Sequence, residues 1–259
     1  MTTVRATTAD VPGPPPQQSV LAALDALDCF ATSEELGVTD VSRRLGVAKS
    51  TAHRLLTALC SRGMVDRIPD TGHYRLGLHL WELGQLVQDR TPLRQVALPV
   101  LEEVRLRTGQ TTYLAIVDDA DVVFVEVLPS LSGLPLLGER QRRVPLHTTS
   151  AGKVLAAFNP EVSEARIAAG FPALTDRTIR SPGQWASCLA DVRRRGLAVS
   201  DSDNLLGVAS VAAPVTDTSG QAVAAVSVAG PSQELLGDLD RHSRVVLAAA
   251  ARISRRAGG

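Results

Sequence analysis

The sequence predicts an α+β protein with an N-terminal winged helix-turn-helix and a C-terminal domain built on a mostly antiparallel sheet. Between residues 39 and 77, two short amphipathic segments separated by a glycine precede a β-hairpin pattern. The same segment carries a local excess of basic residues. Beyond residue 110, β-rich runs joined by hairpin turns alternate with helical segments. With the helices expected on one side of the sheet, this arrangement is typical of the α+β class.

Length and composition exclude several classes of protein. A chain of 259 residues with 44% hydrophobic and 21% charged residues is long enough for two folded domains. Its 27 basic residues balance 27 acidic ones, which excludes a chain that is basic throughout but permits a local basic face. The three cysteines are widely spaced, which argues against a disulfide framework or a zinc knuckle. With no signal-peptide pattern and no apolar run of about 20 residues, we expect a cytoplasmic protein.

The N-terminal elements are predicted from signals for helix starts and ends. Residues 1–18 are rich in proline and threonine and are expected to form a disordered tail. Ser19 is expected to be the N-cap of a first helix, and Thr39 the N-cap of a second, shorter helix. Gly46 should end this second helix, because glycine readily adopts the left-handed conformation of a tight exit.

The third helix, within LGVAKSTAHRLLTALCSRG at residues 45–63, has two distinct faces. Alone, such a pattern is typical of a packed helix with a solvated polar side. Residues 64–77 follow with two β-rich runs around Pro-Asp-Thr-Gly, which predicts a hairpin, and the whole order is that of a winged helix-turn-helix (residues 19–77). The apolar face consists of Ala52, Leu55, Leu56 and Leu59, and the polar side of Ser50, Arg54, Thr57 and Ser61 with His53 at the flank.

Local charge favours a functional role for that polar side. From Val41 to Arg75 there are seven basic residues and two acidic ones, a net charge of plus five. A DNA duplex attracts such a surface through its phosphates. We expect Arg54 to pair with guanine, Lys49 and the helix N-terminus to contact phosphate, and the wing arginines to lie along the backbone or minor groove. The predicted DNA-binding residues are Arg43, Lys49, Ser50, Thr51, His53, Arg54, Thr57, Arg67 and Arg75.

The remaining pattern predicts a linker helix at residues 78–90 and a second domain at residues 91–259. Thr91-Pro92 is a start signal for a longer helix that runs to Gly109, and Pro99 should kink or break it. The expected strands cover residues 111–119, 121–129, 142–147, 197–201, 208–215 and 221–230, and the expected helices cover about 150–158, 160–170, 182–195 and 231–256.

Motifs for catalysis are lacking in the sequence. TSAGKV at residues 149–154 is not a phosphate-binding loop, because His147 stands where that motif needs glycine and Val154 where it needs Ser or Thr. It is better interpreted as a strand-to-helix turn in which glycine permits a close backbone approach and the helix N-terminus offers N–H groups to an anion. His147 is interpreted as structural. No metal ion or cofactor is predicted.

Two alternatives to a ligand-responsive DNA-binding protein stay open. One is an enzyme domain fused to a DNA-binding module, with His147 and either Ser150 or Ser210 as catalytic groups, although no GxSxG motif surrounds these serines. The other is a scaffold whose basic helix is merely solvated.

The residues just described resemble the IclR family of bacterial transcriptional regulators. The likeness runs from Ser19 to about Ser254 and is most specific in KSTAHRLL and VPLHTTSAGK. It implies a linker helix that pairs protomers, a GAF-like effector domain and a small-molecule effector, an organic or aromatic acid. It also implies homodimers that pair into tetramers on palindromic or repeated operators.

The resemblance also implies a set of effector-binding residues. This chain departs from the family pattern where Ala209-Ser210 replaces Arg-Cys and where Ala229 replaces serine. The missing cysteine removes a thiolate ligand for zinc, and the missing hydroxyl indicates a pocket less polar than in members that sense two- or three-carbon acids. We therefore expect a larger effector, such as an aromatic or branched-chain acid. The implied residues are Leu136, Val144, Ser150, Ala151, Ser200, Asp201, Ser210, Ser227 and Ala229.

Overall fold

The computed structural model describes residues 18–89, 92–132 and 142–257, which divide into two compact units between Gln88 and Asp89. Each unit is considered by itself. The predicted tail, apart from Gln18, lies outside the described residues, as do Thr91 and Leu136. No helix in the described part of the chain is long and apolar enough to span a membrane.

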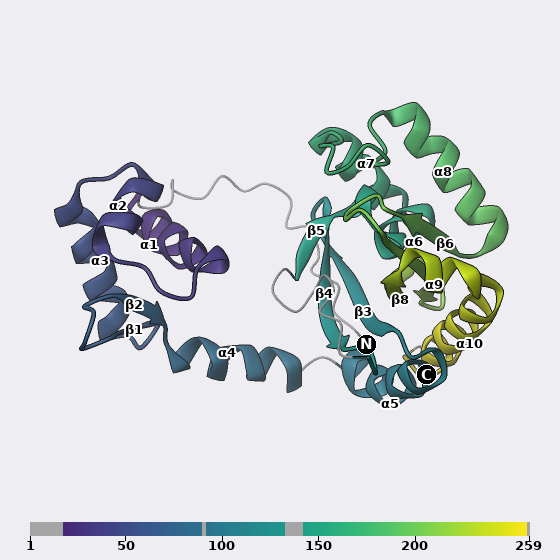
Figure 1. Cartoon of the computed structure of the whole chain (residues 1–259), viewed down its shortest axis with the longest axis horizontal. Helices are drawn as coiled ribbons and strands as arrows, with labels where there is room; N and C mark the ends of the chain where they lie inside the picture. Colours follow the sequence, from purple (N-terminus) through teal and green to yellow (C-terminus); the bar gives the residue numbers. More distant parts are fainter. Residues whose placement is uncertain (1–17, 90–91, 133–141, 258–259) are drawn as a thin grey trace. The chain divides into compact units, whose positions relative to one another are not determined.

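The first unit has the predicted order of a winged helix-turn-helix (Figure 1). Eight buried side chains form its core, contributed by the helices, the segment before the second helix and the hairpin: Ala26, Phe30, Leu36, Val41, Ala52, Leu56, Val65 and Tyr74. The elements are α1 (Gln18–Asp28), the 3-10 helix η1 (Cys29–Thr32), α2 (Val38–Leu45), α3 (Lys49–Ser61), β1 (Val65–Arg67), β2 (Tyr74–Leu76) and α4 (Leu78–Asp89).

Two helix starts differ from the prediction. Helix α2 begins at Val38, so Thr39 lies inside it, and the N-cap is Gly37. The N–H of Gly37 donates to the carboxylate of Asp40 at 3.2 Å, which caps the helix two residues earlier than the threonine hydroxyl would. Ser19 likewise lies inside α1 rather than before it. The predicted end of α2 is confirmed, since Gly46 has a φ of 65°.

The second unit contains a six-stranded antiparallel sheet in the order β5-β4-β3-β8-β7-β6. All six predicted strands are present. They are β3 (Thr111–Asp118), β4 (Asp121–Leu128), β5 (Arg143–Pro145), β6 (Ala198–Asp201), β7 (Val208–Thr216) and β8 (Ala222–Pro231). The other elements are α5 (Pro92–Thr108), the 3-10 helix η2 (Leu146–Thr148), α6 (Ser150–Ala157), α7 (Pro160–Ala169), α8 (Pro182–Arg195), α9 (Ser232–Gly237) and α10 (Leu239–Ala257).

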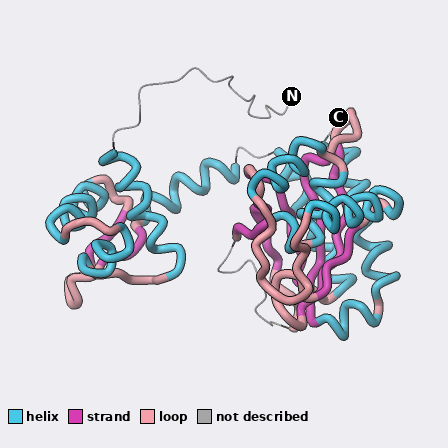
Figure 2. The backbone as a smooth tube through the Cα atoms, turned by 90° about the horizontal axis from the view of Figure 1, so that it is seen from above, coloured by secondary structure: helices cyan, strands magenta, loops and turns pink. Residues whose placement is uncertain are grey.

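Helices cover both faces of this sheet, so the expectation that they lie on one side is wrong. One hydrophobic core joins the sheet to α6, α7 and α8, and a second joins it to α5 and α10. Figure 2 shows the strands with helices around them. The two-sided burial follows from the composition of β7 and β8, whose small apolar side chains on both faces exclude water from both.

Two helices of this unit also differ from the prediction. Helix α5 continues through Pro99, which lies on its exposed side, where a missing backbone hydrogen bond costs least. The expected helix at 231–256 is two helices, because the chain leaves the helical conformation at Asp238, directly after Gly237. The α+β class itself is confirmed.

Candidate functional site

Helix α3 separates its two faces as the periodicity predicts. Ala52 and Leu56 are fully buried, whereas Ser50, His53 and Arg54 are exposed. Lys49 in the first turn is exposed as well. Among the other candidates, Thr51 is half-buried, and the hydroxyl of the exposed Thr57 donates back to the His53 carbonyl at 2.8 Å.

Most of the candidate cations of this unit have no acidic partner within the described part of the chain, and these are Lys49, Arg54, Arg67 and Arg75. Arg43 differs, because it lies 2.6 Å from Asp40. The neighbouring Arg44 holds α2 against η1, donating to the Cys29 carbonyl at 2.5 Å. Positive charge on α3 and the hairpin is therefore available to an external anion, whereas on α2 it is partly used within the fold.

The hairpin places its two arginines differently from each other. Antiparallel register pairs Arg67 with Tyr74 and Asp66 with Arg75. Because successive side chains in a strand alternate between faces, Arg67 and Arg75 project from opposite faces of the hairpin. Both are exposed.

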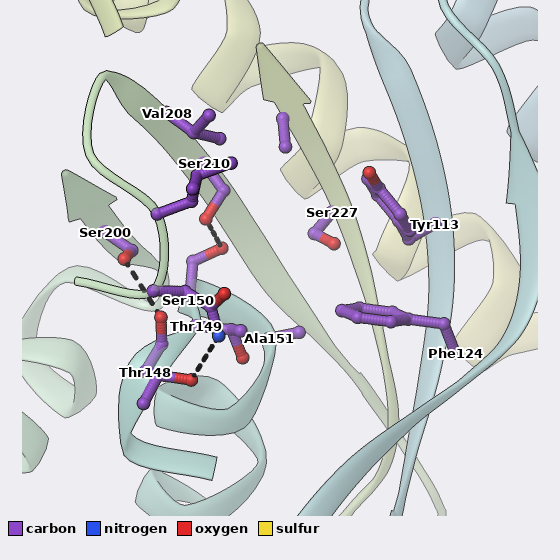
Figure 3. A pocket seen from close by; sticks show the side chains of 13 residues that line it. Tyr113, Phe124, Thr148, Thr149, Ser150, Ala151, Ser200, Val208, Ser210 and Ser227 are labelled. Carbon is purple, nitrogen blue, oxygen red and sulfur yellow. Dashed lines mark hydrogen bonds between the residues drawn. The ribbon is translucent and has the colours of Figure 1, made fainter. Parts of the chain in front are cut away.

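In the second unit, a pocket with about 450 Å³ of empty space, part of which is open solvent, lies between the start of α6 and strands β3, β4, β6, β7 and β8 (Figure 3). The cavity, which we call the effector pocket, is lined by Tyr113, Phe124, Thr148, Thr149, Ser150, Ala151, Ser200, Asn204, Leu205, Val208, Ser210, Ser227 and Ala229.

Six of the nine implied effector residues line this pocket: Ser150, Ala151, Ser200, Ser210, Ser227 and Ala229. Val144 does not, because it is buried in the core beneath α6. Asp201 is also outside the lining: its carboxylate accepts a hydrogen bond from the Ser232 hydroxyl at 2.8 Å and pairs with Arg177. The Ser232 hydroxyl, with smaller contributions from Ser202 and Arg177, lowers the pKa of Asp201.

Sequence reasoning missed seven lining residues, which come from four parts of the chain. Tyr113 and Phe124, on adjacent strands, have ring centroids 4.8 Å apart and form an apolar wall. Thr148 and Thr149 directly precede α6. The sequence could have indicated them only through their position next to Ser150 and Ala151, which were predicted. The others lie in or next to the β6–β7 loop: Asn204, Leu205 and Val208.

Internal hydrogen bonds organise the polar side of the pocket. The hydroxyl of Ser150 donates to that of Ser210 at 2.7 Å and so links α6 to β7 (Figure 3). Asn204 donates to the Thr148 hydroxyl at 2.8 Å. Ser227 differs: it is only 3% exposed, and its hydroxyl has no partner among the described residues.

The start of α6 packs unusually close to η2. Thr149 caps the helix by accepting the N–H of Gly152 at 3.1 Å. A Cβ on Gly152 would lie 2.1 Å from the carbonyl oxygen of Leu146, so only glycine fits, as the sequence predicts. The first N–H groups of the helix, those of Ser150 and Ala151, have no intrahelical acceptor and lie at the pocket.

A buried ion pair fixes the β6–β7 loop to α6. Lys153 and Asp203 are 5% and 7% exposed and contact each other directly. Lys153 also donates to the Val199 carbonyl at 3.2 Å, and Asp203 accepts from the Ser200 hydroxyl at 2.9 Å. Both charges are thus satisfied inside the protein.

His147 is arranged as a structural residue. It is fully buried, and its Nε2 lies 3.0 Å from the Pro172 carbonyl oxygen. Burial lowers the pKa of His147, which favours the neutral ring. Its Nδ1 has no partner in the described part of the chain, and the Ser150 and Ser210 hydroxyls bond to each other rather than to it. The arrangement required by the enzyme alternative is not formed.

A winged helix with accessible cations, and a second unit with a pocket lined by polar and aromatic side chains, are typical of a DNA-binding regulator that takes a small molecule. Comparison with known families agrees. Residues 19–69 match the IclR helix-turn-helix domain, and residues 85–255 match the family described as bacterial transcriptional regulator IclR C-terminal. The chain belongs to the IclR family of transcriptional regulators.

Relatives and solved structures extend this result. The chain is 37% identical over 214 residues to the HTH-type transcriptional regulator XynR of Escherichia coli (strain K12), covering 82% of this chain and 85% of that protein. It is 34% identical over 222 residues to the glycerol operon regulatory protein of Streptomyces griseus, covering 85% and 87%. These relatives are regulators rather than enzymes.

Among solved structures, the Thermotoga maritima IclR superposes with a TM-score of 0.75 at 28% identity, covering 93% of this chain and 99% of that one. An IclR homologue from Microbacterium hydrocarbonoxydans, complexed with 4-hydroxybenzoate, superposes with a TM-score of 0.80 at 29% identity, covering 92% and 99%.

Proposed function

We propose that the polar side of α3 recognises an operator and that an organic or aromatic acid in the effector pocket changes the affinity of this recognition. The observation that carries the proposal is the set of exposed cations without acidic partners on α3 and the hairpin. In this scheme, residues 19–77 bind DNA in the cytoplasm, residues 78–90 link the domains, and residues 91–259 bind the effector.

The individual DNA contacts follow from chemistry and position. Arg54 has the forked guanidinium that pairs with guanine, and Lys49 lies at the helix start, where phosphates bind. Ser50, Thr51 and His53 are short polar side chains near the same end. Thr57 and Arg43 contribute less in this scheme, because one is bonded to its own helix and the other to Asp40. Because Arg67 and Arg75 project from opposite faces of the hairpin, they do not contact the same wall of a DNA groove in this scheme.

Exposed apolar side chains support assembly into a homodimer. On α4, Leu78, Trp81 and Leu86 are 65%, 63% and 49% exposed, and α1 exposes Val20 and Leu24. Apolar surface of this kind marks an interface rather than a solvated helix. Two copies joined through it would present two α3 helices to half-sites about 34 Å apart, or multiples of this spacing. Pairing of such dimers into tetramers belongs to the same proposal.

The effector arm of the proposal rests on the pocket. Its apolar wall of Tyr113 and Phe124 suits an aromatic or branched skeleton, and the related protein complexed with 4-hydroxybenzoate supports an organic acid. An effector that binds one arrangement of the dimer better than the other shifts the population and, with it, operator affinity.

Fluorescence anisotropy of labelled duplexes from the upstream regions of neighbouring genes tests the proposal. Full-length protein should bind one region at least tenfold more tightly than random DNA, and binding should weaken steeply with salt, because several cations displace counterions. Addition of 4-hydroxybenzoate or other acids from a metabolite screen should shift this affinity. Equal affinity for every duplex, or a flat salt dependence, would refute the assignment of α3.

A further inference from the structure

We infer that the effector pocket selects ligands with one carboxylate and at least one hydroxyl group and rejects dianions. The inference rests on the proposed effector role of the pocket and adds the charge and polarity of the ligand. It follows from three features: the charges near the lining, one unpartnered hydroxyl that faces the pocket and the chemistry of the remaining polar groups.

The described lining offers no ionised side chain to an anion. The cation closest along α6, Lys153, is neutralised by Asp203 and also donates to the Val199 carbonyl. Among the described lining groups, positive potential is left at the first turn of α6, where the N–H groups of Ser150 and Ala151 and the helix dipole amount to about half a unit charge. This is enough for one carboxylate. A second negative charge would be desolvated without compensation.

Ser227 provides a separate sign that a polar ligand group enters the pocket. The residue is only 3% exposed on β8, and its side chain points into the cavity, toward the space bounded by Tyr113 and Phe124 (Figure 3). Its hydroxyl has no partner within the described residues. It faces the pocket rather than the surrounding protein, so it is free to form a hydrogen bond with a ligand oxygen.

The other polar groups fit ligand hydroxyls better than further carboxylates. The hydroxyls of Thr148 and Ser200 already donate to the Pro145 carbonyl and the Asp203 carboxylate, so towards a ligand they can only accept. A ligand hydroxyl can donate to them, whereas a carboxylate only accepts. On the opposite side, the rings of Tyr113 and Phe124 give the carbon skeleton an apolar surface. The pocket thus has a weakly positive end at the start of α6, several hydroxyl groups along its lining and one apolar wall.

Isothermal titration calorimetry with full-length protein at fixed ionic strength tests this selectivity through two matched sets of acids. The first is gluconate, glucarate and hexanoate; the second is 4-hydroxyphenylacetate, 1,4-phenylenediacetate and phenylacetate. Within each set the second acid exchanges a terminal hydroxymethyl or hydroxyl group for a second carboxylate function, and the third lacks hydroxyls. In at least one set, the hydroxylated monoacid should bind about tenfold more tightly than both others, equivalent to about 1.4 kcal/mol.

Three variants keep the inference separate from a general loss of folding. Ser227→Ala should weaken binding of the hydroxylated monoacid about 3–10-fold, the range for loss of one hydrogen bond. Val208→Lys places a cation at the half-buried edge of the lining and should raise the affinity for the dianion of that set at least about tenfold. The matched control is Leu206→Lys, which adds the same charge at a residue that is 68% exposed and outside the lining, and it should change neither affinity.

The outcomes distinguish failure of the proposed ligand selectivity from failure of the proposed regulatory function. A dianion or a hydroxyl-free acid that binds the unmodified protein most tightly and shifts operator affinity would overturn the selectivity and leave the proposed function standing. Equal effects of Val208→Lys and Leu206→Lys would also overturn the charge argument. If no acid of either set binds, the selectivity is refuted, and if no acid of a wider metabolite screen alters operator affinity either, the effector arm of the proposed function falls with it.

Discussion

The buried ion pair between Lys153 and Asp203 yields the most quantitative prediction. Asp203→Asn retains the shape of the side chain and an oxygen that can accept from Ser200, so the change removes little except the charge. Lys153 is then left 95% buried without a counter-ion, with only neutral acceptors: the Val199 carbonyl and the amide oxygen that it shares with Ser200. Removing one partner of a buried pair typically costs about 3–5 kcal/mol, and we expect a loss of this size in the free energy of unfolding of the second unit.

A double-mutant cycle separates the pair from the neighbouring packing. Lys153→Met should cost a similar amount, because it leaves the Asp203 carboxylate buried with only hydroxyl donors. The double variant, Lys153→Met with Asp203→Asn, contains no buried charge. It should therefore be more stable than the sum of the two single losses implies, with a coupling of at least about 2 kcal/mol.

Urea denaturation followed by tryptophan fluorescence measures these values. The chain has two tryptophans: Trp185 is fully buried in α8 of the second unit, and Trp81 is 63% exposed on α4, so the change in emission reports mainly on the second unit. Asp191→Asn is the control, because Asp191 pairs with Arg194 on the surface, where such pairs contribute about 0–1 kcal/mol. The reasoning is refuted if Asp203→Asn costs no more than this control or if the coupling is near zero.

Three further variants test other features. Arg54→Ala should weaken operator binding by about 1–3 kcal/mol with little effect on random DNA, measured by anisotropy; equal losses on both would make Arg54 a phosphate contact. Gly152→Ala should destabilise the second unit by about 2 kcal/mol or more in the urea assay, because the added Cβ would lie 2.1 Å from the Leu146 carbonyl oxygen, whereas Gly183→Ala in α8 meets no atom within 4 Å and should be neutral or slightly stabilising. Because burial lowers the pKa of His147 below its ordinary value of 6.5, the unfolded chain takes up the proton first, and stability should decrease as pH falls below about 6.5. His147→Gln should reduce this loss between about pH 7.5 and 5.5, and an unchanged pH dependence would show that other groups cause it.

Features that depend on nearby residues were predictable from the sequence. The two faces of α3 follow from helical periodicity over a few turns, and the hairpin from Pro-Asp-Thr-Gly between two β-rich runs. Gly46 and Gly152 were identified because their roles, a left-handed exit and a close backbone approach, suit glycine alone. In each case the deciding interactions lie within a few residues of the pattern.

Other features depend on competition or on distant segments. Thr39 is a good N-cap residue, but the carboxylate of Asp40 captures the Gly37 N–H and starts α2 earlier. The break between α9 and α10 had a signal in Gly237, which a long amphipathic pattern concealed. The two-sided burial of the sheet was indicated by β8, whose residues are apolar on both faces rather than alternating.

The effector pocket likewise combines residues that could be predicted from nearby sequence with residues that depend on distant segments. The residues around the start of α6 could be located from the sequence. Tyr113 and Phe124 meet because the β3–β4 register places Phe124 opposite Ala115, two residues from Tyr113 on the same face of the sheet. The pattern of the strands alone does not show that this face lines a pocket. Asp201 was expected to contact the effector, and the partner that draws its carboxylate away, Ser232, lies 31 residues further along the chain.

The hydrogen bond between Ser150 and Ser210 has a consequence for how much each serine contributes to effector binding. Ser150 donates its one hydroxyl hydrogen to Ser210, so a ligand that accepts from Ser150 exchanges one hydrogen bond for another, and the net gain is small. The hydrogen of Ser210 is not used in this bond. Under the proposed function, Ser210 is therefore the member of the pair that adds more to the affinity for an effector, and Ser150 mainly holds it in position.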